Sequence, residues 1–165
     1  MATALKNLSE YKESAIPSSA GMKFGIVISE YNPAITDALG QAAIETLIKH
    51  GTSEHDIEVR YVPGSFELVL GAQYFAEYRE TDAVISLGCV IQGETKHFDF
   101  ICEAVAQGIK QLNIDYHKPF IFGLLTTNNQ QQAVDRAGGK HGNKGVEAAI
   151  AAIKMVHLQH EMESQ

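Results

Sequence analysis

The sequence is poor in the residues that build metal centres and redox sites. It has only two cysteines in 165 residues, Cys89 and Cys102, and their spacing matches neither a metal site nor a redox motif. We therefore expect two reduced thiols that pack against apolar neighbours. No two of the seven histidines have convincing ligand spacing, so we predict that the protein holds no metal.

Long apolar runs and an excess of basic residues are also missing. No stretch resembles a transmembrane segment, and the N-terminus lacks the apolar core of a signal peptide, which predicts a cytoplasmic protein without a membrane partner. The 20 acidic residues outnumber the 13 basic ones, for a formal net charge of −7. This balance argues against nucleic acid as a partner, because phosphate backbones bind basic surfaces.

What is present indicates one globular domain. A length of 165 residues with 45% hydrophobic residues is enough for a substantial core, and no repeat, low-complexity run or linker divides the chain. Residues 1–21 mix charge with serine, proline and glycine. We therefore expect an N-terminal arm over 1–21 and a single domain over 22–165.

Strand and helix patterns alternate along this domain. Short apolar or alternating segments predict four strands, over residues 23–29, 57–61, 83–91 and 120–126. Helical spacing follows each strand, with Asn32, Ser65 and Thr95 as candidate N-caps of the first three helices. The last two helices are expected over 130–137 and 146–160. This alternation predicts an α/β fold, a three-layer α/β/α sandwich with a four-stranded parallel sheet.

The clearest local signal of function lies in residues 83–100. The apolar run that begins at Ala83 leads to a turn at Gly93 and then to a helix whose first turn includes His97. The N–H groups and dipole at such a turn favour an anion and disfavour imidazolium, so we expect His97 to be neutral near pH 7 and able to accept a proton. A base beside an anion site indicates chemistry on a phosphorylated small molecule. An exposed histidine in an ordinary turn explains the same residues.

Other candidates follow the remaining strands, at the edge of the sheet where ligands of parallel sheets bind. Tyr31 could stack on a flat heterocycle, Asn32 could bond to its edge, and Glu67 could accept hydrogen bonds from hydroxyl groups. Each also has an ordinary explanation, as a partly exposed aromatic residue, a helix cap or a first-turn carboxylate.

The segment near residue 140 adds positive charge to an acidic chain. Arg136 precedes two glycines and could bind phosphate through both arms of its guanidinium group, and Lys144 follows in the same glycine-rich loop. A solvated arginine in a flexible surface turn is the alternative. Phe122 lies within a strand, and its position alone predicts a core residue.

Four motifs occur in one order: PGSFE at 63–67, GCVIQGETKHFDF at 88–100, FGLLTTNN at 122–129 and DRAGGKHGNKG at 135–145. Together they make the chain resemble the 6,7-dimethyl-8-ribityllumazine synthase family from about residue 23 to about residue 158. The resemblance implies a flavodoxin-like fold and a transferase of riboflavin biosynthesis. That family joins 5-amino-6-(D-ribitylamino)uracil to 3,4-dihydroxy-2-butanone 4-phosphate, releases phosphate and water, and uses no cofactor or metal.

The resemblance also implies a role for each matching residue. Tyr31 is the aromatic residue that stacks on the pyrimidine, with Asn32 beside it, and His97 is the acid/base. Arg136 binds the phosphate. The other substrate contacts implied are Ser65, Phe66 and Glu67 for the pyrimidine and ribityl chain, Cys89, Val90 and Ile91 for the pyrimidine edge, Glu94, Thr95 and Lys144 for the phosphate end, and Phe122 from a neighbouring subunit.

Two positions depart from the family pattern. Tyr31 stands where many members have phenylalanine or tryptophan, so stacking is kept and a hydroxyl group is added. Glu94 places an acid in the phosphate turn. Phosphate binding there requires backbone N–H donors and a carboxylate that points away.

The resemblance finally implies self-association. Five subunits are expected to form a ring in which the N-terminal arm, with Ala15 and Ile16, pairs with the open sheet edge of a neighbour. The absence of an insertion in 138–145 favours closure of twelve rings into an icosahedral 60-mer, which could hold riboflavin synthase.

Two functions are alternatives to the enzyme. One is a shell protein whose main role is assembly, and the other is a flavin- or nucleotide-binding module.

Overall fold

The computed structural model describes residues 7–164, and its core is a four-stranded parallel sheet. The strands are β1 (Phe24–Ser29), β2 (Ile57–Val62), β3 (Ala83–Ile91) and β4 (Phe120–Thr127), in the spatial order β2-β1-β3-β4. The α/β class with a flavodoxin-like parallel sheet is therefore confirmed. Each strand is a short run rich in β-branched or aromatic residues, which suits a strand with both faces covered.

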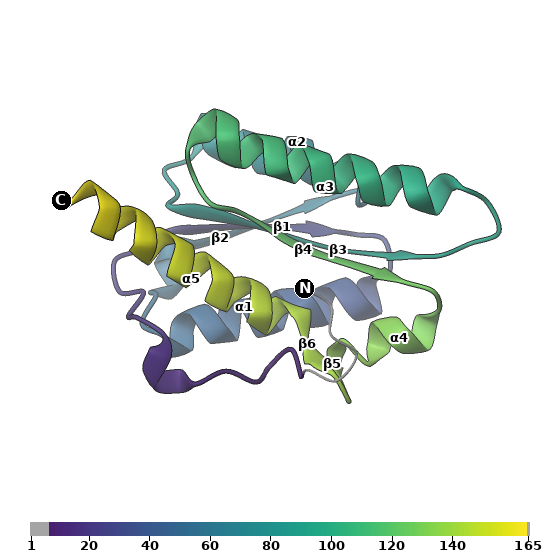
Figure 1. The fold of residues 1–165 in the computed structure, drawn as a ribbon, viewed down its shortest axis with the longest axis horizontal. Coiled ribbons are helices and arrows are strands. Elements are labelled where there is room, and N and C mark those ends of the chain that lie inside the picture. Colours follow the sequence, from purple (N-terminus) through teal and green to yellow (C-terminus); the bar gives the residue numbers. More distant parts are fainter. Residues whose placement is uncertain (1–6, 165) are drawn as a thin grey trace.

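Helices cover both faces of the sheet and complete three layers (Figure 1). One face carries α1 (Pro33–Lys49) and α5 (Lys144–Glu163), and the other carries α2 (Leu68–Tyr78) and α3 (His97–Tyr116). The short helix α4 (Gln130–Val134) and the hairpin of β5 (Ala137–Gly139) and β6 (Gly142–Asn143) lie on the α1/α5 side.

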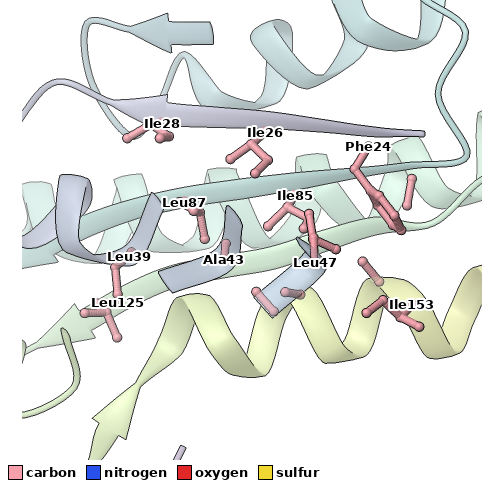
Figure 2. Close-up of a cluster of buried hydrophobic side chains, with 14 of the residues drawn as sticks. Phe24, Ile26, Ile28, Leu39, Ala43, Leu47, Ile85, Leu87, Leu125 and Ile153 are labelled. Carbon is pink, nitrogen blue, oxygen red and sulfur yellow. The ribbon is translucent and has the colours of Figure 1, made fainter. Parts of the chain in front are cut away.

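The core is divided by the sheet into two apolar clusters. Figure 2 shows Ile26 and Ile28 of β1 on the side of α1, where Leu39 and Leu47 meet them. The intervening Val27 points to the other face and packs with α2 and α3. Because side chains alternate along a strand, a continuous apolar run supplies both clusters at once.

The strands differ in length at their carboxyl ends, and this creates room for a site. The pairing of β1 with β3 ends at Ile28 opposite Leu87, whereas β3 and β4 stay paired as far as Ile91 opposite Thr127. The last residues of β3 therefore extend past β1 with one side not covered by a strand.

Of the three predicted N-caps, Asn32 stands at the N-cap position of its helix, whereas Ser65 and Thr95 do not. Asn32 stands at the start of α1 but makes no side-chain cap, and Ser65 is three residues before the first residue of α2. The Ser65 carbonyl, not its hydroxyl, accepts the N–H of Leu68 at 3.2 Å. Thr95 precedes the N-cap position of α3, although its hydroxyl accepts the N–H of His97 at 3.4 Å. Tertiary contacts therefore override the cap chemistry that the letters suggest.

Two helices have other bounds than expected. The helix predicted over 130–137 ends at Val134, because the chain turns there into the β5–β6 hairpin, in which the carbonyl of Asp135 accepts the N–H of His141 at 2.8 Å. The last helix begins at Lys144, since the Asn143 side chain caps it by accepting the N–H of Gly145 at 2.8 Å. The segment between these two helices thus forms a hairpin, and not the flexible surface turn that was the alternative.

The described part of the arm lies against its own chain. The N–H of Leu8 donates to the carbonyl of His141 at 2.7 Å, and the ammonium of Lys49 pairs with the Glu13 carboxylate at 2.6 Å. The predicted arm also includes residues 1–6, which lie outside the described residues. Pairing of the arm with a neighbour stays a prediction, as does the division into arm and domain.

Residues 7–164 contain neither a helix suited to span a membrane nor a cluster of metal ligands. None of the helices there combines the length and the apolar character that crossing a membrane requires. Likewise, those residues include no group of three or more His, Cys, Asp and Glu side chains placed to hold a metal ion.

Candidate active site

A cavity of about 730 Å³ lies beyond the carboxyl ends of β1 and β3, between the turn before α2 and the first turns of α3. It gathers ten of the predicted site residues: Tyr31, Asn32, Ser65, Phe66, Glu67, Cys89, Val90, Ile91, Thr95 and His97. These come from three separate strand-to-helix connections, which the parallel topology brings to one edge.

Two aromatic side chains stand exposed at this cavity. Tyr31 has 73% of its surface exposed and Phe66 has 58%. Ser65, next to Phe66, is buried. Exposed rings beside a concave surface offer flat apolar faces to a planar ligand, so the cavity suits a heterocycle.

The end of β3 offers backbone groups to the cavity. The N–H groups of Val84 and Gln92 both bond on the β4 side, to Pro119 and Thr127. Because successive residues of a strand direct their N–H and C=O groups to opposite sides, those of Cys89 and Ile91 point toward β1. Since β1 has ended there, this strip faces the cavity that both residues line.

One of these backbone groups already has a partner. The Asn32 amide Nδ2 donates to the Cys89 carbonyl at 3.1 Å. Asn32 also has a left-handed backbone, with φ 62°. The predicted role of Asn32 in bonding a heterocycle edge therefore competes with an intramolecular bond.

The Cys89 side chain is chemically quiet. Its residue is 2% exposed, and burial raises the pKa of the thiol to about 11. The neutral form then dominates near pH 7, and the nucleophile in cysteine chemistry is the thiolate. Cys89 and Ile91 thus face the cavity with their backbone groups, whereas the backbone groups of Val90 point toward β4.

His97 is the first residue of α3 and is exposed to the cavity. Thr95 lines the same wall, and its hydroxyl accepts the His97 N–H. The positive dipole end of a 20-residue helix therefore faces the cavity beside an imidazole. This arrangement can hold an anion next to a proton carrier.

Four cavity residues were not among the predicted site residues, namely Gly64, Gly93, Phe98 and Ile101. Phe98 and Ile101 follow His97 on α3 and line the cavity. Ile101 lies one helical turn beyond both His97 and Phe98, so the signal in the sequence was helical spacing, because residues one turn apart share a face.

Four predicted residues do not line this cavity: Glu94, Phe122, Arg136 and Lys144. The Arg136 guanidinium donates to the Gln132 carbonyl at 2.9 Å, and the Lys144 ammonium pairs with Glu147 at 3.1 Å. The core position expected for Phe122 is wrong, because 37% of its surface is exposed on the edge strand β4.

A second cavity, of about 560 Å³, lies between β2 and α2. Its wall includes Tyr61, Tyr74 and Tyr78, and it shares only Glu67 with the predicted site residues. No histidine lines it. Of these two cavities, the first therefore has a histidine in its wall and the second does not.

Comparison with known proteins matches this sequence to one family. A sequence model of the 6,7-dimethyl-8-ribityllumazine synthase family matches residues 21–160, which contain every residue of the first cavity. The chain belongs to this family. Its relatives carry that name, and two of them are a Parabacteroides distasonis protein, 56% identical over 158 residues, and a Cytophaga hutchinsonii protein, 57% identical over 156 residues.

These similarities extend over almost the whole chain. The alignments cover 96% of this chain and 99% of the Parabacteroides protein, and 94% and 98% for the Cytophaga protein. A Porphyromonas gingivalis relative is 52% identical over 159 residues, with 96% and 99% covered. The resemblance noted from the four motifs is thereby confirmed for the family.

Proposed function

We infer that the protein is a transferase of riboflavin biosynthesis that condenses 5-amino-6-(D-ribitylamino)uracil with 3,4-dihydroxy-2-butanone 4-phosphate to give 6,7-dimethyl-8-ribityllumazine, phosphate and water. The observation that carries this inference is the cavity at the carboxyl end of the sheet. It combines exposed rings, a free backbone strip and a histidine at a helix N-terminus, in a chain of the lumazine synthase family. The substrates are small molecules, and no cofactor enters the proposal.

In this proposal, the pyrimidine binds between the Tyr31 ring and the backbone at the end of β3. Tyr31 stacks on the heterocycle, and the polar backbone groups of Cys89–Ile91 meet its edge. Ser65, Phe66 and Glu67 hold the pyrimidine and the ribityl chain. The exposure of Tyr31 and the lack of a paired strand on the β1 side of Ile91 support this placement.

His97 moves the protons. The amine condenses with the ketone, phosphate leaves by elimination, and the ring closes with loss of water, so each stage needs proton transfer near one carbon skeleton. A positioned acid/base contributes about 10²- to 10⁴-fold. The remaining acceleration comes from holding two substrates together, for which effective molarities are large.

The phosphate lies at the N-terminus of α3. Thr95 and backbone N–H groups of the turn bind it, and the Glu94 side chain, which does not line the cavity, leaves the anion unopposed. Arg136 and Lys144 act in the cavity of a neighbouring subunit. The Lys144 N–H donates to the Arg136 carbonyl at 2.9 Å, so the two residues are adjacent in the backbone, and neither lines the cavity of its own chain.

Self-association follows from the same reasoning. Phe122 reaches a neighbour from β4, where 37% of its surface is exposed. The outer edge of β2 has no strand partner among the described residues, and the arm of another subunit pairs there. We propose a pentamer as the building block and the 60-mer as the complete particle, with riboflavin synthase as a possible guest.

A cytoplasmic location completes the proposal. Both cysteines are free, and thiols stay reduced in that compartment.

Product formation from the two substrates tests the function. Release of phosphate together with 6,7-dimethyl-8-ribityllumazine is expected, at a rate that depends on both substrates. A protein that assembles but forms no product would be a shell, and one that binds flavin or nucleotide without turnover would be a binding module. Sedimentation at neutral pH measures the particle mass in the same preparation.

A further inference from the structure

Asn32 has an uncommon conformation for the residue that precedes a helix. Such residues usually have an extended backbone and cap the helix with their side chain, whereas Asn32 has φ 62° and makes no cap. Its carbonyl accepts the N–H groups of Ile35 and Thr36 at 2.9 and 3.1 Å. Pro33, at the start of α1, has no N–H that needs a partner. The helix therefore has little need of the Asn32 amide.

The amide is used across the cavity instead. Its Nδ2 donates to the carbonyl of Cys89, which is 57 residues away in the chain. That carbonyl points toward β1 beyond the last paired residues, Ile28 and Leu87. The left-handed backbone of Asn32 thus places a side-chain donor where a strand would otherwise have supplied one.

We propose that Asn32 is a positioning residue for the pyrimidine. Its amide holds the Cys89 carbonyl, and this fixes the backbone strip Cys89–Ile91 whose other polar groups meet the pyrimidine edge. The inference rests on the proposed function, and it replaces the direct contact with substrate expected from the sequence. Asn32 acts through the strip and does not touch the reacting atoms.

The first test is Asn32→Gly. Glycine adopts the left-handed backbone without strain, so the variant removes the amide and little else. The KM for 5-amino-6-(D-ribitylamino)uracil is expected to rise about tenfold, which corresponds to about 1.4 kcal/mol. The kcat and the KM for the butanone phosphate should stay within about twofold, since His97 and the phosphate turn are held by α3.

Asn113→Ala is the matched control for loss of an asparagine. Asn113 donates to the carbonyls of Ile109 and Phe120 at 2.7 and 3.0 Å, and it does not line the cavity. Its removal should lower Tm and leave the KM for the pyrimidine unchanged. The pair of variants separates positioning from general stability.

The second test is Asn32→Asp, which keeps the size of the side chain and tolerates the left-handed backbone. An ionised carboxylate there opposes the Cys89 carbonyl, whereas a protonated one can donate to it. The ratio of pyrimidine KM values, variant to wild type, should therefore fall as the pH is lowered from about 7.5 to about 5. A purely structural role predicts a ratio that does not change with pH.

The outcomes are distinguishable. A wild-type protein that forms no product overturns the proposed function and this inference with it. An active wild type together with an unchanged pyrimidine KM in Asn32→Gly overturns the inference alone. An equal rise of both KM values, or a pH-independent ratio in Asn32→Asp, does so as well.

Discussion

Gly88 is the position where a single methyl group should disturb both stability and the site. A Cβ at Gly88 would lie 2.8 Å from Cδ1 of Leu124, 2.8 Å from Cδ1 of Leu68 and 3.0 Å from Oγ of Ser65. Leu68 and Leu124 are almost fully buried, so neither can move aside freely. Overpacking of this kind costs about 1–3 kcal/mol, which lowers Tm by about 2–12 °C in a domain of this size.

Gly93→Ala provides the matched control for Gly88→Ala. A Cβ at Gly93 meets no atom within 4 Å, and both variants restrict the unfolded chain equally. The difference in Tm between them therefore measures the overpacking alone. Because Ser65 lines the cavity, Gly88→Ala should also raise the KM for the pyrimidine.

Calorimetry and steady-state kinetics at one protein concentration measure both effects. Equal Tm values for the two variants would refute the packing argument. A lowered Tm with an unchanged pyrimidine KM would keep that argument and remove Ser65 from the pyrimidine site.

The remaining predictions concern the residues of the proposed mechanism. His97→Ala should lower kcat by about 10²- to 10⁴-fold while substrate binding, measured by titration calorimetry, stays near normal; unchanged turnover would remove His97 from the mechanism. Arg136→Ala should weaken the butanone phosphate far more than the pyrimidine, and equal losses would indicate misfolding instead. The raised pKa of Cys89, about 11, means that the folded state keeps a proton that the unfolded state loses above about pH 9. The stability that this thiol contributes is therefore complete below pH 9 and lost between about pH 9 and 11. Over that range the free energy of unfolding, measured by denaturant titration, should fall less steeply with pH for Cys89→Ala than for the wild type. Parallel curves for the two proteins would contradict a buried thiol. Light scattering should give the mass of a pentamer or of a larger particle. An active species of about 18 kDa, the mass of one chain, would contradict the proposal that neighbouring subunits share an active site.

Local patterns were enough for the strands. Strands β1, β3 and β4 agree with the expected ranges to within one residue, because each is a short apolar run that ends at polar or glycine residues. The PGSFE and GCVIQGETKHFDF motifs likewise contain most of the residues that line the cavity, since consecutive residues at a strand-to-helix connection remain together in any parallel sheet.

Contacts between different segments of the chain could not be predicted from local sequence patterns. How much of Phe122 is exposed depends on the order of the strands, which leaves β4 at an edge of the sheet. The periodicity of a single strand does not predict that order. The end of α4 depends on a hairpin whose pairing involves residues on both sides of a glycine turn.

The sequence by itself therefore determined which segments are strands and helices and which connections line the cavity, because periodicity and motif spacing are local properties of the chain. Only the tertiary structure decided which partner each polar side chain takes. Asparagine is a residue type that often caps helices, yet the Asn32 amide donates to the Cys89 carbonyl, because the fold places that carbonyl beyond the end of β1. A side chain binds whatever acceptor lies within reach, and for Asn32 that acceptor is 57 residues away in the chain.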